Sequence, residues 1–162
     1  MEVKAIQDTG VRIERATSGD LAEILRIEQA SLPTPWTRKM FEVELDQNPF
    51  GRLEVMRRSG ETGLIGYVCY WVVFEEWRLM TLAVDPSARR QGHGRALLRH
   101  AMARGREQGA TRALLEVRAS NTAAMQMYEQ EGFHRVGTRA RYYANPVEDA
   151  VLMERALSGG AA

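Results

Sequence analysis

The chain has 162 residues, 44% of them hydrophobic, which suits one domain with a sizeable core. Lys and Arg total 22 against 21 Asp and Glu, so the net charge of +1 gives no electrostatic reason to expect nucleic acid or membrane as a partner. The single cysteine, Cys69, excludes an internal disulfide, and no Cys/His cluster has the spacing of a zinc site. We therefore expect a soluble, cytoplasmic monomer without a metal.

The first half of the chain predicts a strand, two helices and three strands. Val11 and Ile13 alternate with charged residues as in a strand, and residues 17–20 form a capping box before a helical apolar pattern. Residues 33–36, Pro-Thr-Pro-Trp, must break that helix, and Thr37 is a suitable cap for a second one. The three following strands are expected at residues 53–57, 65–74 and 77–84, as an antiparallel meander.

The second half alternates helices and strands. An Arg/Gly-rich loop leads into an apolar helical stripe that ends near residues 105–109, and a strand follows at 113–117. Asn121 is a good N-cap for a helix ending at Gly132. Two last strands are expected at 133–137 and 150–155, and 158–162 have the composition of a flexible tail. The order predicts one α/β (α+β) domain over 1–157, with a mixed, mostly antiparallel sheet of six to seven strands flanked by helices.

The loop between the strand at 82–84 and the next helix has the composition of a phosphate-binding site. Free N–H groups and the positive dipole end at a helix N-terminus attract anions, and glycines allow a close backbone approach. The segment carries Arg89, Gly92 and Gly94, with Arg90 and Arg95 as further positive charges. A short glycine pattern is weak by itself, because an ordinary loop with solvated arginines has the same composition.

The glycine pattern resembles the Q/R-x-x-G-x-G/A loop of the GCN5-related N-acetyltransferase (GNAT) superfamily. The resemblance continues through residues 114–121, 123–124, 127–133 and 141–143, and so covers nearly the whole chain. Together with Pro35-Trp36, this ordered set is most similar to the RimI type of ribosomal-protein alanine N-acetyltransferase. The resemblance implies acetyl-CoA as cosubstrate and a fold whose central strands splay apart.

Acetyl transfer to an amine requires a base for the amine and an acid for the departing thiolate. Glu116 lies in an apolar strand, where burial would raise its pKa, and it is the candidate base, acting directly or through water. Its alternative is a solvent-facing strand residue. Tyr128 lies two helical turns after Asn121 and is the candidate acid, with a buried core tyrosine as the alternative. Cys69 has no histidine near it in sequence, which favours direct transfer over an acyl-cysteine.

The family resemblance also implies the cofactor contacts. The end of the splayed strand would offer backbone groups to pantetheine, the loop would hold the pyrophosphate, and Asn121 would contact the pantetheine arm as well as capping its helix. The expected cofactor-binding residues are Leu82, Ala83, Val84, Arg89, Arg90, Gln91, Gly92, His93, Gly94, Arg95 and Asn121. In two departures from the usual pattern, His93 replaces an aliphatic residue and Arg78 replaces a strand acid, which leaves proton removal to Glu116.

A protein N-terminal amine is the expected acceptor. Its pKa near 8 lies below the 10.4 of lysine, so its deprotonation at neutral pH is easier by roughly 3 kcal/mol. The resemblance implies that Tyr142 and Tyr143 clamp the acceptor peptide, that Pro35 and Trp36 form the opposite wall, and that the acceptor is a ribosomal protein beginning with Ala or Ser. Two alternatives stay open: an acetyltransferase for lysine or a small amine, and a non-catalytic CoA-binding regulatory module.

Overall fold

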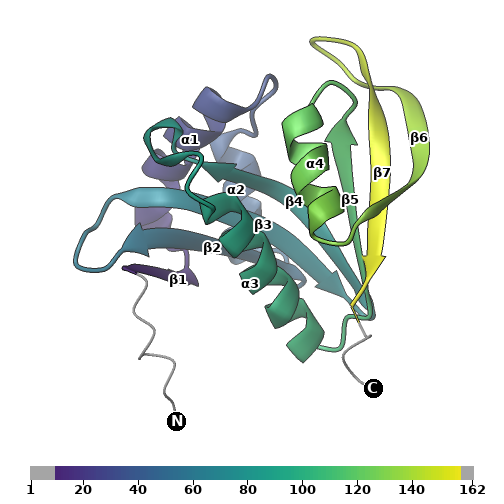
Figure 1. The fold of residues 1–162 in the computed structure, drawn as a ribbon. Coiled ribbons are helices and arrows are strands. Elements are labelled where there is room, and N and C mark those ends of the chain that lie inside the picture. Colours follow the sequence, from purple (N-terminus) through teal and green to yellow (C-terminus); the bar gives the residue numbers. More distant parts are fainter. Residues whose placement is uncertain (1–9, 158–162) are drawn as a thin grey trace.

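The computed structural model describes residues 10–157, which form a mixed sheet with helices on both faces (Figure 1). The strands are β1 (Val11–Arg15), β2 (Gly51–Arg58), β3 (Leu64–Val73), β4 (Glu76–Val84), β5 (Arg112–Arg118), β6 (His134–Tyr143) and β7 (Glu148–Ala156). The helices are α1 (Leu21–Ser31), α2 (Arg38–Asp46), α3 (His93–Glu107) and α4 (Thr122–Gln130). This arrangement confirms the predicted fold class.

The strands follow the order β1-β2-β3-β4-β5-β7-β6, and every neighbouring pair is antiparallel except β4 with β5. That parallel pair is short: Glu76–Arg78 pair with Arg112–Leu114, and no ladder pair follows. The two strands therefore diverge from Leu79 onward, as Figure 1 shows. The predicted splay of the central strands is confirmed.

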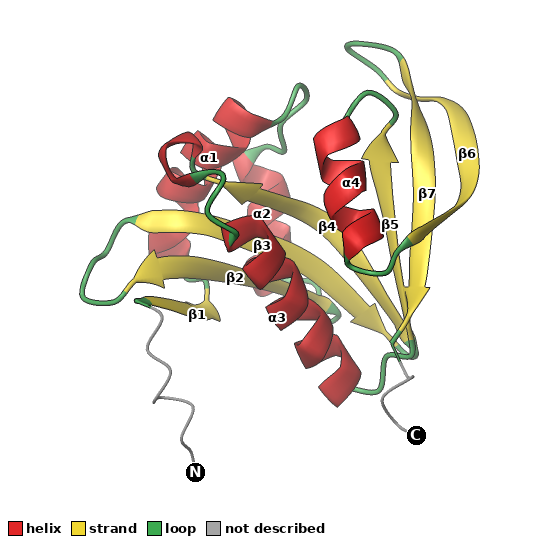
Figure 2. Ribbon diagram, viewed as in Figure 1, coloured by secondary structure: helices red, strands yellow, loops and turns green. Residues whose placement is uncertain are grey.

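Two apolar layers hold the helices on the sheet, α3 and α4 on one face and α1 and α2 on the other (Figure 2). The first layer includes Trp77, whose indole N–H donates to the Ala101 carbonyl of α3 at 3.0 Å, and Leu115 of β5. The second includes Phe41 of α2 and Tyr67 of β3. Because side chains alternate along a strand, a single strand can contribute to both layers.

The predicted helix caps form as expected. The Asp20 carboxylate accepts the Thr17 backbone N–H at 2.9 Å just before α1. The Thr37 hydroxyl accepts the Met40 N–H before α2, and the Asn121 side chain accepts the Ala124 N–H before α4. Local polar residues thus fix where α2 and α4 begin, and the Thr17–Asp20 box closes the 3-10 turn that leads into α1.

The largest difference from expectation is β6, which continues to Tyr143 rather than ending at 137. Its residues are almost all exposed, so no buried alternation marks the strand in the sequence. Pairing with β7 creates it instead, with irregular register between Arg139 and Tyr143 and a left-handed φ of +54° at Arg141. The expected tail at 158–162 lies outside the described residues.

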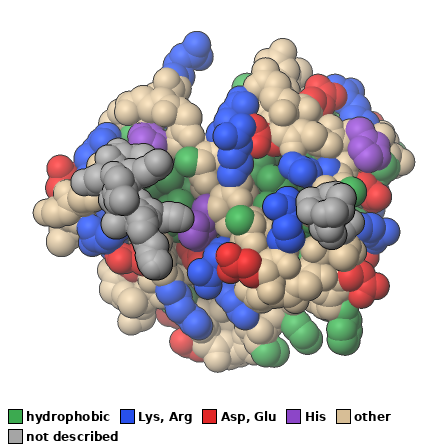
Figure 3. Space-filling model, turned by 60° about the horizontal axis from the view of Figure 1, so that its bottom comes forward, with side chains coloured by type: hydrophobic (Ala, Val, Ile, Leu, Met, Phe, Trp, Pro, Cys, Tyr) green, Lys and Arg blue, Asp and Glu red, His purple; other side chains and the backbone are tan. Residues whose placement is uncertain are grey.

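Charges of both signs are interspersed over the face in Figure 3, without a large patch of one sign. Within residues 10–157, every helix is too short or too polar to cross a bilayer.

Candidate active site

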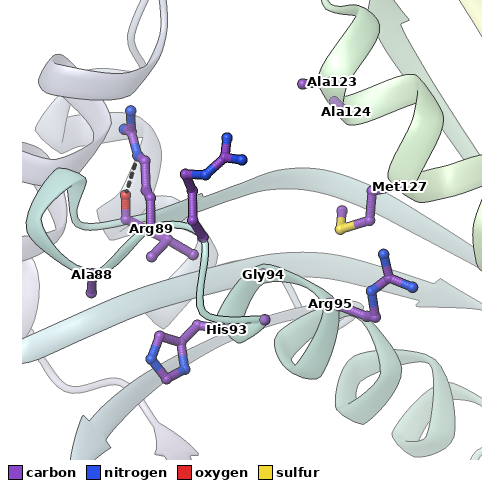
Figure 4. A pocket seen from close by; sticks show the side chains of 11 residues that line it. Ala88, Arg89, His93, Gly94, Arg95, Ala123, Ala124 and Met127 are labelled. Atoms are coloured by element: carbon purple, nitrogen blue, oxygen red, sulfur yellow. Dashed lines mark hydrogen bonds between the residues drawn. The ribbon is translucent and has the colours of Figure 1, made fainter.

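A cavity of about 570 Å³ lies between the start of α3, the end of β4 and the first turns of α4 (Figure 4). Its lining includes most of the expected cofactor-binding loop and adds four residues that the sequence did not single out as site residues. The lining residues are Val84, Ala88, Arg89, Arg90, Gly92, His93, Gly94, Arg95, Ala123, Ala124 and Met127. The small alanine side chains leave room on the α4 side of this cavity.

The backbone of the loop turns sharply before α3. Arg90 and Gly92 both have positive φ, +63° and +82°, and Gly92 is the N-cap of the helix. The first-turn N–H groups of α3 have no acceptor within the helix, and left-handed residues beside them make a concave set of N–H donors. This part of the cavity suits a phosphate group, with the helix dipole adding to the attraction.

Two of the loop arginines are already engaged with protein groups. Arg89 donates to the Val84 carbonyl at 3.1 Å and to the Ser31 hydroxyl at 2.8 Å, which ties the loop to β4 and α1. Arg95 donates to Glu131 and Gln130 at the end of α4. Figure 4 shows Arg89 and Arg95 on opposite sides of the loop. Their guanidinium groups secure the walls of the cavity.

Four expected cofactor residues are absent from the lining: Leu82, Ala83, Gln91 and Asn121. Leu82 packs toward α3, whereas Ala83 is buried in the layer beneath α1 and α2. The Asn121 side chain is used as the cap of α4. His93 does line the cavity, but its Nε2 is fully shielded and has no hydrogen-bond partner among residues 10–157.

A bulge in β4 adjoins the point where β4 and β5 diverge. Cys69 pairs with Thr81 and Tyr70 with Leu79, so Met80 is the extra residue in β4. A bulge bends its strand and redirects side chains. Met80 gives no sequence signal for such a bulge, and the strand pattern alone did not predict it.

Glu116 lies on the face of β5 opposite its buried neighbours Leu115 and Val117, and so points to the side of α1 and α2. Its side chain is 29% exposed, which is less burial than the apolar strand suggested. One carboxylate oxygen lies 3.6 Å from Nη1 of Arg139 on β6. Glu116 is therefore a partly solvated carboxylate in contact with a cation.

Tyr142 and Tyr143, at the end of β6, lie beside Glu116. Their rings meet edge to face with centroids 5.1 Å apart. The negative charge of Glu116 raises the pKa of Tyr142. Burial, followed by that same charge, raises the pKa of Tyr143 to about 12. Both hydroxyls hence remain protonated at neutral pH, and the Tyr142 hydroxyl donates toward the Glu116 carboxylate.

Tyr128 lies on the opposite side of β5, in the layer with Leu115, Val117 and Phe133. Burial raises its pKa to about 12. Tyr128 is 8% exposed, and no hydrogen bond of its hydroxyl is found among residues 10–157. Its phenol is therefore a buried donor in the apolar layer.

The Pro35-Trp36 loop is fixed by a buried carboxylate that the sequence analysis missed. Glu28 of α1 is 0% exposed and accepts the Trp36 backbone N–H at 2.9 Å. It also accepts hydrogen bonds from the Tyr67 hydroxyl and, at 3.0 Å, from the Thr81 hydroxyl next to the bulge. Its place in an amphipathic helix gave no sign of these contacts.

A second missed residue is Arg118, two positions after Glu116. Its guanidinium is within hydrogen-bond reach of Thr34 in the α1–α2 loop and of the Ala144 and Pro146 carbonyls in the β6–β7 hairpin. It also covers the Tyr143 ring at 4.4 Å from the centroid. The sequence placed Arg118 in a family motif without indicating that it joins two distant loops.

Comparison with known proteins agrees with this geometry. Residues 21–133 match the Acetyltransferase (GNAT) family model. The chain is 36% identical over 141 residues to the [ribosomal protein bS18]-alanine N-acetyltransferase of Escherichia coli, covering 86% of this chain and 93% of that protein. It is 39% identical over 127 residues to N-alpha-acetyltransferase RimI of Mycobacterium tuberculosis, covering 75% of each.

The fold is also similar to a crystal structure of the Escherichia coli ribosomal-protein-S18-alanine N-acetyltransferase, with a TM-score of 0.82 and 34% identity over 91% of this chain and 94% of that one. The sequence motifs, the sheet topology and the glycine-loop cavity therefore all agree with these comparisons. The chain belongs to the GNAT family of acetyltransferases, and within it is most like the RimI type.

Proposed function

We propose that this protein transfers the acetyl group of acetyl-CoA to the N-terminal α-amine of a ribosomal protein that begins with alanine or serine. The observation that carries the proposal is the placement of Glu116 beside the divergence of β4 and β5. On one face of the sheet, Glu116 of β5 lies beside the acceptor tyrosines of β6, and the opposite face of β5 packs against α4, which also lines the glycine-loop cavity. An acceptor and a cofactor on opposite faces would meet at this divergence.

Acetyl-CoA fits the donor groups of the cavity. Its pyrophosphate would lie against the N–H groups at the start of α3, where Gly92 and Arg90 turn the backbone. The lining by Ala123, Ala124 and Met127 suits the apolar parts of a pantetheine arm. When bound, acetyl-CoA supplies the activated thioester, and the GNAT relatives share this cosubstrate.

Glu116 is the proposed base. The attacking nitrogen must lose a proton as its bond to the thioester carbonyl carbon forms, and Glu116 would accept that proton directly or through one water. Its 29% exposure allows the proton to pass on to solvent afterwards. A carboxylate is a weak base, so it suits an α-amine of pKa near 8 better than a lysine near 10.4.

Tyr128 is the proposed acid. As the carbon–sulfur bond breaks, the electron pair goes to sulfur, and the phenol would donate its proton to the departing thiolate. The pKa of about 12 keeps Tyr128 protonated before reaction. Direct transfer needs no enzyme nucleophile, and burial raises the pKa of the Cys69 thiol, which makes its reactive thiolate scarce.

The walls around Glu116 favour a chain end as the acceptor. The α1–α2 loop and the β6–β7 hairpin touch, since the Thr34 hydroxyl lies 3.4 Å from the Ala144 carbonyl and 3.3 Å from that of Asn145. A chain terminus can enter end-on beneath joined loops more easily than a side chain in the middle of a folded surface. Relatives named as bS18-alanine N-acetyltransferases support alanine as the first residue.

Acceptor profiling tests the proposal. We would measure thiol release from acetyl-CoA with free-N-terminus peptides beginning Ala, Ser, Met and Glu, with N-blocked lysine peptides, and with spermidine. Turnover should be greatest on Ala or Ser peptides. Glu116→Gln and Tyr128→Phe should each reduce kcat by roughly 10²–10⁴-fold, the usual range for general acid–base catalysis.

Two matched variants separate chemistry from folding. Glu154→Gln changes a carboxylate on the neighbouring strand β7, and Tyr70→Phe removes a buried hydroxyl that donates to Glu54. Both should retain kcat within a few-fold. Turnover only on blocked lysine or spermidine would refute the N-terminal acceptor, and cofactor binding without any turnover would favour a regulatory module.

A further inference from the structure

We propose that Arg118 is a positioning residue that joins the α1–α2 loop and the β6–β7 hairpin into one wall of the acceptor site. This inference deepens the proposed function and rests on its placement of the acceptor beside Glu116. It assigns to Arg118 a role in peptide binding that does not involve contact with the reacting atoms.

The contacts of Arg118 reach two separate parts of the chain. Nη2 lies 3.2 Å from the Thr34 hydroxyl and 3.3 Å from the Ala144 carbonyl. Nη1 lies 3.1 Å from the Pro146 carbonyl and 3.4 Å from a Glu148 carboxylate oxygen. Thr34 is separated from Arg118 by 84 positions, and the hairpin residues follow it by 26 to 30. The single planar guanidinium group of Arg118 thus bridges elements that are far apart in the sequence.

Burial and aromatic contact make this bridge rigid. The Arg118 side chain is only 10% exposed, and its guanidinium carbon lies 4.4 Å from the centre of the Tyr143 ring. A cation over an aromatic face at this distance is attracted by the ring, and more so when shielded from water. Glu148 adds a second anchor by accepting the Ser120 N–H at 2.8 Å. Arg118 therefore holds Tyr143, a proposed peptide clamp, in a fixed orientation.

Lysine cannot replace these contacts. Its ammonium is a compact charge on a flexible stem, whereas the guanidinium presents several donors in one plane and stacks on aromatic rings. The contacts with Thr34 and Pro146 come from different nitrogens of the same guanidinium group. In the Arg118→Lys variant, the shorter donor group would reach only one of the two loops at a time.

The kinetic test compares Arg118→Ala and Arg118→Lys with Arg112→Ala, a matched change at the far end of β5, where Arg112 is half-exposed and pairs with Glu76. For a six-residue Ala peptide we expect KM to rise roughly 10–100-fold in Arg118→Ala, the loss typical of charged hydrogen bonds, and less in Arg118→Lys. KM for acetyl-CoA should change less than about two-fold, because Arg118 does not line the glycine-loop cavity. Arg112→Ala should leave all of these values unchanged.

Amide hydrogen exchange supplies a readout that needs no turnover. In Arg118→Ala, exchange should accelerate in residues 32–37 and 143–147 and stay unchanged in α3 and in β2. Equal acceleration across the sheet, with KM for both substrates raised, would show a merely structural role and overturn the proposal. Unchanged exchange at the two loops would overturn it as well. If the acceptor were not a peptide N-terminus, the proposed function would fail while the exchange result still decided the role of Arg118.

Discussion

Arg139 on β6 places its guanidinium 3.6 Å from the Glu116 carboxylate on β5, across the intervening strand β7. Two strand spacings amount to about 10 Å, a gap that a long arginine side chain spans. The pair is loose and 56% of the Arg139 side chain is exposed, so its direct contribution to stability is small, on the order of 1 kcal/mol or less. Its effect should appear in the binding of a charged acceptor instead.

Arg139→Gln should improve acceptor binding at low ionic strength. A peptide N-terminus arrives largely protonated at pH 7, and the positive Arg139 opposes it. Removing this charge should lower KM for an Ala peptide by roughly two- to five-fold at about 20 mM salt, and the difference should vanish near 1 M salt because of screening. Steady-state kinetics at the two salt concentrations checks this. A raised KM would show instead that Arg139 contacts the acceptor directly.

The pH dependence of the reaction should have a rising limb alone. The acceptor must be neutral to attack, so kcat/KM for an Ala peptide should rise with pH up to the amine pKa of about 8. Tyr128, with its pKa raised to about 12 by burial, loses its proton only above that range and so imposes no fall between pH 8 and pH 10. A plateau there, measured by thiol release, is the expected result. A descending limb near pH 9 would exclude Tyr128 as an acid of this pKa.

The sequence predicted those features that depend on local chemistry. Thr17 and Asp20 form the predicted capping box before α1, Thr37 and Asn121 cap α2 and α4, and Gly92 turns the loop before α3. Features that depend on contacts between distant parts of the chain could not be predicted from the sequence. The full length of β6 depends on pairing with β7, and the bulge at Met80 depends on the register with β3. These pairings leave no periodic pattern in the chain itself.

The same distinction applies to the candidate site. The glycine loop is contiguous in sequence, and seven of the expected cofactor-binding residues in and beside it line the cavity. The environment of Glu116 is assembled from β5, β6 and the loops, so its exposure and its contact with Arg139 could not be read from the alternation of one strand. Arg118 and Glu28 were missed for the same reason, because their partners lie up to 84 positions away.

The two loop glycines should respond differently to alanine. Gly92 has φ +82°, where an L residue is strained, so Gly92→Ala should cost roughly 1–2 kcal/mol of stability and distort the loop. Gly94 lies in the first turn of α3, and an added Cβ would meet Val84 and Leu82 at ordinary distances of 3.7 and 3.8 Å. Gly94→Ala should therefore stabilise the free protein by about 0.5–1 kcal/mol.

Denaturant unfolding and KM for acetyl-CoA together test this contrast. Gly94→Ala should raise KM for acetyl-CoA by no more than a few-fold, since the family pattern accepts Gly or Ala at this position. Gly92→Ala should raise it by at least about ten-fold, because the N–H groups at the start of α3 no longer converge. Equal effects of the two substitutions on KM would contradict the role given to the left-handed turn.

Glu28 provides the strongest stability prediction. It is fully buried and its two oxygens accept from the Trp36 N–H and from the Tyr67 and Thr81 hydroxyls. Glu28→Ala leaves these three donors without an acceptor, and each buried unsatisfied group costs about 1–3 kcal/mol, so a loss of at least about 3 kcal/mol is expected. Glu28→Gln should cost less than half as much, since its carbonyl can accept from Trp36 while its amide donates to hydroxyls that rotate.

The functional consequence of these two Glu28 variants should follow the Trp36 contact. Because Glu28→Gln keeps an acceptor for the Trp36 N–H, it should retain KM for an Ala peptide within a few-fold, whereas Glu28→Ala frees the Pro35-Trp36 wall and should raise KM about ten-fold. Urea unfolding and peptide kinetics below the unfolding transition measure both effects. Equal losses of stability in the two variants would mean that negative charge, rather than hydrogen-bond acceptance, is what the three donors require of Glu28.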